Sequence, residues 1–233
     1  TEDLTIDLAH LERRIAETGA RVLLLSHMRG HICDMGKLMA LCDGAGVQVV
    51  EDCAHTMGAE WNGVPSGRHG AMACYSTQTY KHMNSGEGGL LISDDAELMA
   101  RAILLSGSYM LYDRHRAAPP PEVFAGLRYE VPNVSGRMDN LRAAILRPQL
   151  TILPEQVARW NRLYRAMEDG LAETPGLRLI PRPGSGRYVG SSFQFLLPGW
   201  TGEGVREVVA RCAARGVELK WFGAGEPAGF TSK

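Results

Sequence analysis

The sequence predicts an α/β protein whose first part forms a mostly parallel sheet and whose last part forms a smaller α+β domain. Three observations lead to this prediction. Short, continuous apolar runs alternate with helical segments in the first half of the chain, as in proteins built on a parallel sheet. The connections between these segments are short, so we expect right-handed crossovers. Past Pro175, short strand-like runs dominate and indicate a second domain.

The first elements carry clear local signals. Residues 7–18 place apolar side chains on one helical face after a possible Asp7 cap, and Gly19 stands where a helix would end. Residues 22–26 form a short apolar run, which suits a strand that is covered on both faces of the sheet. Asp34 is then a candidate cap for a second helix.

Further strands and a long loop follow the second helix. We expect strands at residues 47–50, 71–76 and 89–92, and then a helix over about 95–105. Residues 106–136 contain several glycines and prolines and show little periodicity. A loop of this length in a compact domain usually has a function, so it is the best candidate for a segment that covers the substrate.

Two helices and a second domain complete the prediction. The helices are expected over residues 138–147 and 155–171, the latter with Pro154 in its first turn. An amphipathic helix is expected between the last two strands of the second domain. Those strands are expected at 177–180, 192–197 and 217–220. The sequence therefore predicts a large domain over 1–147 and a small domain, with its linking helix, over 148–233.

The composition excludes several classes of protein. Of the 233 residues, 45% are hydrophobic and 22% are charged, so the chain can bury a sizeable core. The 25 Lys and Arg residues against 26 Asp and Glu lack the excess of positive charge that nucleic acid binding needs. No apolar run approaches the roughly 20 residues that span a bilayer. The five cysteines form no CxxC pair and are expected as reduced thiols. With no leader peptide visible, we expect a cytoplasmic protein.

Polar residues follow the apolar runs at the expected carboxyl edge of the sheet. Glu51 and Asp52 end one strand, and Ser76 and Lys81 follow another. Ligands of open parallel sheets bind beyond this edge, so a carboxylate and an amine could converge there. Pyridoxal phosphate chemistry needs both, because a lysine forms a Schiff base with the cofactor and a carboxylate keeps the ring nitrogen protonated. Ser76 and the glycine-rich run 85–89 could help to bind the phosphate.

Several motifs in this region resemble those of a known family. They are Val50-Glu-Asp-Cys-Ala-His-Thr-Met-Gly58, Tyr75-Ser76 with Lys81 five residues after the serine, and Gly86-Glu-Gly-Gly89. In this order and spacing they resemble the DegT/StrS family of fold-type-I aminotransferases, which aminate keto sugars. The segments 27–35 and 136–144 are also similar to parts of that family. The family extends beyond both ends of this sequence, so we expect both domains to be partial.

The resemblance implies a function and a set of site residues. It implies pyridoxal 5'-phosphate as cofactor, Lys81 as the Schiff-base lysine and Asp52 as the partner of the pyridine nitrogen. The other cofactor contacts that it implies are His55, Ser76, Gln78 and Asn133, with Ser135 as an alternative to Asn133. It also implies a homodimer that transfers an amino group from glutamate or glutamine to a keto sugar, nucleotide-linked, or to a cyclitol ketone.

Three alternatives stay open at this point. A related sugar dehydratase commonly has histidine in place of the Schiff-base lysine, and His82 lies next to Lys81. A non-catalytic or regulatory relative would keep the same fold. A metal site could be built from His31, Cys33, Cys53 and His55. The spacing of these residues matches no compact zinc pattern, so we predict no metal.

Overall fold

The computed structural model describes residues 2–107, 114–182, 184 and 186–223. The chain divides into two compact units, which are considered separately. The first contains Thr1–Ala166 and Pro181–Phe193, and the second contains Met167–Ile180 and Gln194–Lys233. Within the described part of the chain, none of the helices has both the length and the apolar character that crossing a bilayer requires.

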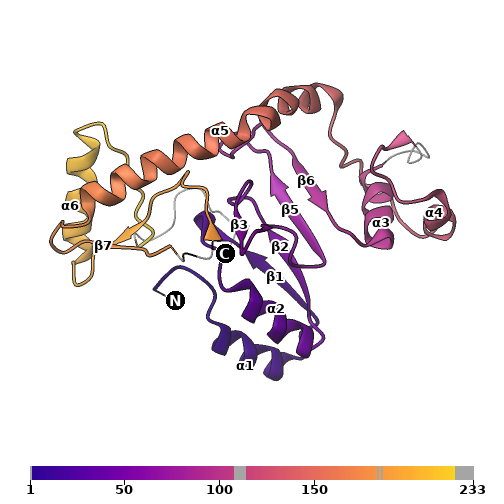
Figure 1. Ribbon diagram of the computed structural model, residues 1–233, viewed down its shortest axis with the longest axis horizontal. Helices are drawn as coiled ribbons and strands as arrows, with labels where there is room; N and C mark the ends of the chain where they lie inside the picture. Colours follow the sequence, from indigo (N-terminus) through magenta and orange to yellow (C-terminus); the bar gives the residue numbers. More distant parts are fainter. Residues whose placement is uncertain (1, 108–113, 183, 185, 224–233) are drawn as a thin grey trace. The chain divides into compact units, whose positions relative to one another are not determined.

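A four-stranded sheet forms the centre of the first unit (Figure 1). Its strands lie in the order β1 (Val22–Ser26), β2 (Gln48–Asp52), β5 (Met72–Ser76) and β6 (Gly89–Ile92). The first three strands are parallel to one another, whereas β6 pairs antiparallel with β5. The predicted α/β fold with a mostly parallel sheet is therefore confirmed, and the carboxyl ends of β1, β2 and β5 share one edge.

Helices α1 (Leu8–Thr18) and α2 (Met35–Gly44) begin at the caps that the sequence indicates. The side chains of Asp7 and Asp34 each accept a hydrogen bond from a backbone N–H in the first turn. Gly19 ends α1 in the left-handed conformation, with φ at 63°. Local capping therefore sets the lengths of both helices.

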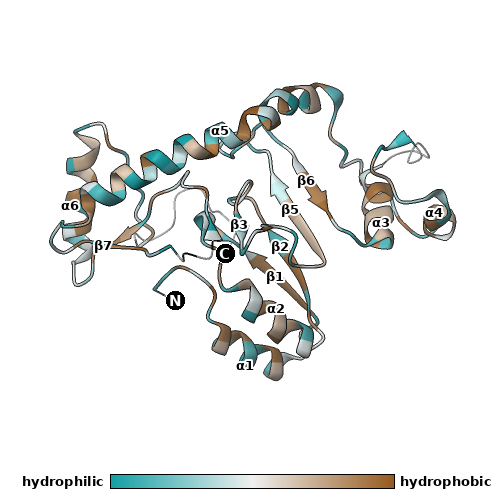
Figure 2. Ribbon diagram, in the orientation of Figure 1, coloured by the Kyte–Doolittle hydropathy of each residue, from teal (hydrophilic) through white to brown (hydrophobic). Residues whose placement is uncertain are grey.

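The two faces of the sheet differ in burial. Leu25 and Val49 belong to the main core, together with side chains of α1 and α2. On the opposite face, Val22 and Leu24 are 59% and 67% exposed, although β1 is among the most apolar strands (Figure 2). The expectation that residues 22–26 are covered on both faces is therefore wrong for the residues that the structure describes. Because side chains alternate along a strand, one face of the sheet stays open.

A single long helix replaces the two that were predicted after the long loop. Helix α5 (Asn140–Leu171) contains both Pro148 and Pro154. Each proline removes one helical hydrogen bond. Leu146, two residues before Pro148, and Leu153, directly before Pro154, pack into the main core, and this packing favours an unbroken helix. The interpretation of Pro154 as a helix start is wrong, and the predicted domain boundary after residue 147 lies inside α5.

The predicted loop over 106–136 contains a helix that the sequence analysis missed. Helix α4 (Pro121–Leu127) packs on α3 (Ala96–Ser106), and Phe124 and Ile103 form the centre of this second, smaller core. Residues 108–113 of the loop lie outside the described residues. The short sheet formed by β3 (Glu60–Trp61), β4 (Val64–Pro65) and β8 (Gly186–Arg187) was also missed. Strands of two residues are too short to show an alternating pattern.

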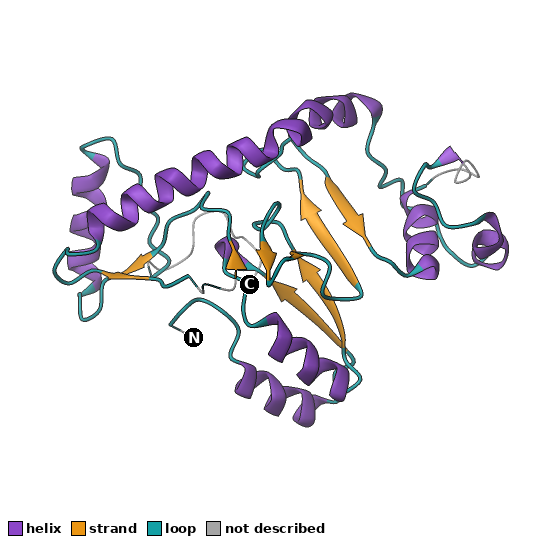
Figure 3. Ribbon diagram, viewed as in Figure 1, coloured by secondary structure: helices purple, strands orange, loops and turns teal. Residues whose placement is uncertain are grey.

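In its described residues, the second unit contains the end of α5, two short strands and the helix α6 (Gly202–Ala213) (Figure 3). Strand β7 (Arg178–Leu179) pairs antiparallel with β9 (Phe195–Leu196), so the predicted strands 177–180 and 192–197 exist in shorter form. Helix α6 begins where Thr201 caps it. Residues 217–220, which the structure describes, form no strand, so that prediction is wrong.

Candidate active site

Three of the predicted site residues meet beyond the carboxyl edge of the large sheet. The Nζ atom of Lys81 lies 3.2 Å from Nε2 of His55. The charge of Asp52 acts on both side chains and favours their protonated forms. Asp52 and His55 belong to one motif and Lys81 follows another, and the fold brings the three to one place.

Asp52 is held at the end of β2 by two hydrogen bonds. Its carboxylate accepts one from the hydroxyl of Ser26, at 2.9 Å, and one from the backbone N–H of Ala54, at 3.1 Å. Ser26 is the residue of β1 that lies opposite Asp52 in the sheet. In β2, Asp52 shares a face with Val50, whose neighbour Leu24 in β1 is exposed. The carboxylate therefore lies on the open face of the sheet.

Lys81 lies in a closed loop between β5 and β6. The backbone N–H of Lys81 donates to the carbonyl of Gln78 at 2.9 Å and forms a tight turn. The loop is closed at its base, where the N–H of Thr77 donates to the carbonyl of Gly88 at 2.9 Å. Gly88 has a φ of 136°, and a Cβ there would lie 2.7 Å from Oγ1 of Thr77, so glycine is required. These bonds fix the position of the lysine.

The electrostatic surroundings favour neutral forms of both basic side chains. Burial is the largest cause of the lowered pKa of Lys81, the Asp52 carboxylate opposes it, and the charge of Arg29 adds to it. Burial also lowers the pKa of His55 to about 4, with contributions from Lys81 and Arg29. The imidazole of His55 is therefore neutral near pH 7, and the amine of Lys81 is closer to its nucleophilic form than an exposed lysine.

Ser76 and Gln78 lie next to this group in the sequence and the fold. Ser76 ends β5 and shares a strand face with Cys74, which is paired with Asp52. The hydroxyl of Ser76 accepts a hydrogen bond from the N–H of Gln78, at 3.3 Å, and Oε1 of Gln78 accepts one from the N–H of Tyr80, at 3.1 Å. Both side chains thus shape the turn that leads to Lys81.

Asn133 lies elsewhere in the first unit. Its side-chain oxygen accepts a hydrogen bond from the N–H of Ser135 at 2.8 Å. It also lies close to Gly107, the residue that ends α3. The contacts that the structure shows for Asn133 are therefore at the end of α3, and its role toward a cofactor stays a prediction.

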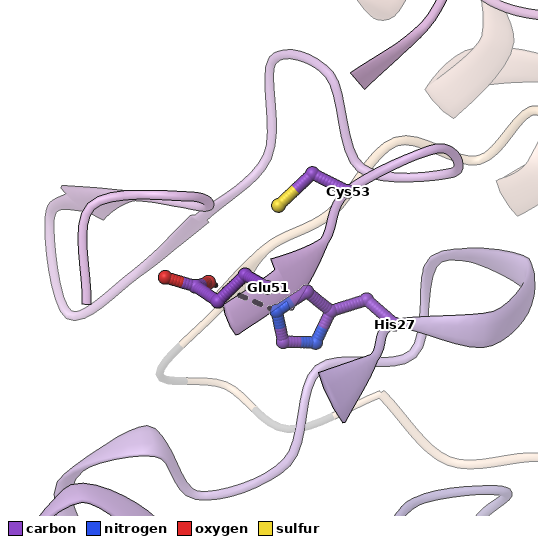
Figure 4. A group of neighbouring side chains, drawn as sticks. All are labelled: His27, Glu51 and Cys53. Atoms are coloured by element: carbon purple, nitrogen blue, oxygen red, sulfur yellow. Dashed lines mark hydrogen bonds and ion pairs between the residues drawn. The ribbon is translucent and has the colours of Figure 1, made fainter. Parts of the chain in front are cut away.

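A buried carboxylate lies on the other face of β2, and sequence reasoning missed its role (Figure 4). Glu51 accepts hydrogen bonds from Nε2 of His27 at 3.0 Å and from the backbone N–H groups of Gly67, His69 and Gly70 at 2.8–2.9 Å. Burial alone would raise the pKa of Glu51, but these donors lower it to about 2. Strand alternation was the available signal, because it places Glu51 and Asp52 on opposite faces.

The group around Glu51 does not suit a metal ion. The ligand atoms of His27, Glu51 and Cys53 lie within 4.8 Å of one another. The Glu51 oxygens are already occupied by four hydrogen bonds. Burial raises the pKa of the Cys53 thiol to about 11, whereas a metal needs a thiolate. The arrangement is a hydrogen-bonded clamp that ties the segment 67–70 to β2.

His82, next to Lys81, has structural contacts. Its ring centroid lies 5.2 Å from that of Trp160, and its Nε2 lies 2.7 Å from the hydroxyl of Ser191. Burial lowers the pKa of His82 to about 4. The side chain is neutral near pH 7 and is engaged with residues other than Asp52 and His55.

Comparisons with known proteins identify the family of this chain. Residues 1–222 match the model of the DegT/DnrJ/EryC1/StrS aminotransferase family. The chain belongs to this family. The solved structure of AtS13 from Actinomadura melliaura is similar over 98% of this chain and 59% of that chain, with a TM-score of 0.77 and 29% identity. The solved structure of S. venezuelae DesV is similar over 98% of this chain and 60% of that chain, with a TM-score of 0.79 and 27% identity. The fold is that of the fold-type-I aminotransferases.

The sequence of this chain is also similar to those of curated aminotransferases. The chain is 31% identical over 187 residues to the L-glutamine:scyllo-inosose aminotransferase of Streptomyces griseus. This match covers 77% of this chain and 42% of the relative. It is 31% identical over 178 residues to the dTDP-3-amino-3,4,6-trideoxy-alpha-D-glucose transaminase of Streptomyces venezuelae, covering 75% of this chain and 43% of the relative. The chain thus spans less than half the length of these two curated relatives.

Proposed function

We propose that this chain forms part of a pyridoxal phosphate-dependent aminotransferase. The enzyme would move an amino group from glutamate or glutamine to a nucleotide-linked keto sugar or to a cyclitol ketone. The observation that carries the proposal is the meeting of Lys81, His55 and Asp52 at the carboxyl edge of the sheet. The two curated relatives, one named for glutamine and scyllo-inosose and one for a dTDP-linked sugar, support the substrate classes.

The side chains at this edge suit pyridoxal phosphate. They offer a partly buried amine for its aldehyde, an anchored carboxylate for its ring nitrogen and, in Ser76, a hydroxyl for its phosphate. When bound, the cofactor supplies an electron sink that stabilises negative charge at the donor Cα.

Each residue of the site has a separate task in the proposed reaction. Lys81 would hold the cofactor through its amine and, once released, would act as the base that moves a proton at the donor Cα. Its lowered pKa favours the neutral amine that this step requires. Asp52 would keep the ring nitrogen protonated. His55, which is neutral, would contact the ring, and its Nε2 lies within hydrogen-bond distance of the free amine of Lys81.

Two observations favour a transferase over a dehydratase. The lysine is present at position 81, within reach of His55 and under the influence of Asp52. His82 is engaged with Trp160 and Ser191 and is therefore a structural residue. A dehydratase of this fold would place a histidine where Lys81 lies.

We also propose that the enzyme is a cytoplasmic homodimer. Support for self-association comes from Leu141, Ile145 and Ile152, which are 43–71% exposed and spaced along one face of α5. Support for a reducing compartment comes from the cysteines, which are all free. Sedimentation of the protein and of Ile145→Glu tests the dimer: the substitution is expected to lower the association constant, and an unchanged monomeric mass in both would contradict it.

The half-reaction with an amino donor tests the activity without knowledge of the ketone. The protein is loaded with pyridoxal phosphate and mixed with glutamine or glutamate, and the 2-oxo acid is measured. We expect one 2-oxo acid per bound cofactor, and none from Lys81→Ala. A loaded protein that releases no 2-oxo acid with either donor would contradict the proposal and favour a non-catalytic relative.

A further inference from the structure

The turn after β1 brings a cation to the site. The 3-10 helix η1 (Met28–Gly30) begins two residues after Ser26, whose hydroxyl binds Asp52. The N–H of His27 donates to the carbonyl of Asp52 at 3.1 Å, which attaches the turn to the end of β2. Burial is the main cause of the lowered pKa of both Lys81 and His55, and the charge of Arg29 lowers both further. The turn that carries Arg29 is thus attached to the end of β2 beside the site, and its charge acts on both residues.

The backbone of this turn is strained. Arg29 has φ 56° and ψ 22°, a left-handed conformation that is unfavourable for residues with a Cβ. Gly30 follows with φ 81°, and a Cβ on it would lie 3.2 Å from the carbonyl oxygen of His55. The turn thus packs closely against the backbone of His55. Unfavourable conformations of this kind cluster at functional sites, where the surrounding structure maintains them.

The order of the strands places Arg29 and Ser76 on opposite sides of Asp52. Arg29 follows β1 and Ser76 ends β5, whereas Asp52 ends β2, which lies between those two strands. If the hydroxyl of Ser76 marks the phosphate side of the cofactor, Arg29 lies on the other side. An anion bound by Arg29 would therefore belong to a molecule other than the cofactor.

We propose that Arg29 binds the α-carboxylate of the amino-acid donor and so makes the site select amino acids over simple amines. This inference rests on the proposed function. In an amino acid the carboxylate and the reacting amino group share one carbon, so the carboxylate must lie close to Lys81. A guanidinium forms paired hydrogen bonds to a carboxylate, which a lysine cannot do.

The test compares Arg29→Gln, Arg29→Lys and Arg29→Gly with Arg13→Gln, an exposed arginine of α1 that serves as the matched control. The measured quantities are the glutamine concentration for half-maximal 2-oxo acid release, the affinity for pyridoxal phosphate and the reaction with a simple alkylamine. Arg29→Gln is expected to raise the glutamine concentration about 10- to 100-fold, as the loss of a charged hydrogen bond predicts. The other two quantities should change less than twofold, and Arg29→Lys should recover part of the loss.

Two readouts do not depend on turnover. Calorimetry with glutarate, a dicarboxylate without an amino group, should show binding that is at least about tenfold weaker in Arg29→Gln than in the Arg13→Gln control. The melting temperature of Arg29→Gly should be unchanged or raised, because glycine relieves the left-handed conformation. These readouts separate the inference from the proposed function, whose own failure would appear as an unsubstituted protein that releases no 2-oxo acid.

Three results would overturn the inference. The first is equal binding of glutarate by Arg29→Gln and the control. The second is a loss of pyridoxal phosphate affinity of tenfold or more in Arg29→Gln, which would assign Arg29 to the cofactor phosphate. The third is an equal loss of rate with alkylamines and amino acids, which would show that Arg29 has no role in selecting the carboxylate.

Discussion

The amine of Lys81 and the imidazole of His55 lie 3.2 Å apart, between Nζ and Nε2. Both groups have a lowered pKa, chiefly because of burial. A neutral imidazole accepts a hydrogen bond from the lysine and adds no charge that would compete with Asp52. The contact thus positions the lysine and leaves the carboxylate as the main partner of positive charge in the site.

The first prediction concerns Asp52. The Asp52 carboxylate raises the pKa of Lys81 against the effect of burial, so Asp52→Asn should lower that pKa further. The pH profile of pyridoxal phosphate incorporation should therefore move to lower pH. Transamination by Asp52→Asn should fall about 100-fold or more, because the ring nitrogen loses its partner.

Ser26→Ala is the matched control for Asp52. It removes one of the two hydrogen bonds to the carboxylate and keeps the charge. We expect it to reduce the rate about tenfold and to leave the pH profile in place. The account of Asp52 would be wrong if the profile of Asp52→Asn moved to higher pH.

The second prediction concerns the stability of the Glu51 clamp. The pKa of Glu51 is about 2 in the fold, against a usual value of 4.5. The ionised carboxylate therefore stabilises the fold fully above about pH 4.5, and this contribution is lost as the pH falls toward 2. The difference between these two pKa values corresponds to about 3 kcal/mol of folding free energy.

Urea unfolding of Glu51→Gln measures this contribution. At pH 7 the substitution should lower the free energy of unfolding by about 3 kcal/mol, because a carboxamide cannot accept from all four donors. The loss should shrink between pH 4.5 and pH 3. Glu12→Gln, on the exposed face of α1, should change stability by less than about 0.5 kcal/mol. A loss that stays constant from pH 7 to pH 3 would argue against the clamp.

The third prediction concerns the segment that donates to Glu51. A Cβ at Gly70 would overlap the carbonyl oxygen of Val49, which belongs to the backbone and cannot rotate away. Gly70→Ala should therefore destabilise the protein by about 2–4 kcal/mol. Gly44→Ala is the matched control, since this helical glycine has open space around it and alanine there should stabilise by up to about 1 kcal/mol. Thermal unfolding distinguishes the two, and equal effects would contradict the described packing.

Local sequence signals predicted the elements that local interactions determine. The caps at Asp7 and Asp34 and the left-handed Gly19 act within a few residues, so α1 and α2 could be placed from the sequence. Glu51 and His27 are 24 residues apart and meet only when β1 and β2 pair, so no local pattern reveals their bond. The same holds for α5, where distant packing outweighs the two prolines that locally favour a break.

The site residues likewise divide into those that sequence motifs reveal and those that only the folded chain reveals. Motif spacing pointed to Asp52, His55 and Lys81, and the fold brings these three together. Arg29 was missed because its importance lies in a backbone turn. The turn that carries Arg29 packs against the backbone of His55 through Gly30, and no feature of the sequence pattern reveals this.

The visible absorbance of the cofactor bound to the protein is the most direct test of the central claim, that Lys81 holds pyridoxal phosphate covalently. The protein, Lys81→Ala and the control Lys37→Ala, an exposed lysine of α2, are loaded with cofactor and dialysed. The unsubstituted protein and Lys37→Ala should keep a yellow absorbance that borohydride removes, and Lys81→Ala should lack it. An unchanged yellow complex in Lys81→Ala would contradict the account.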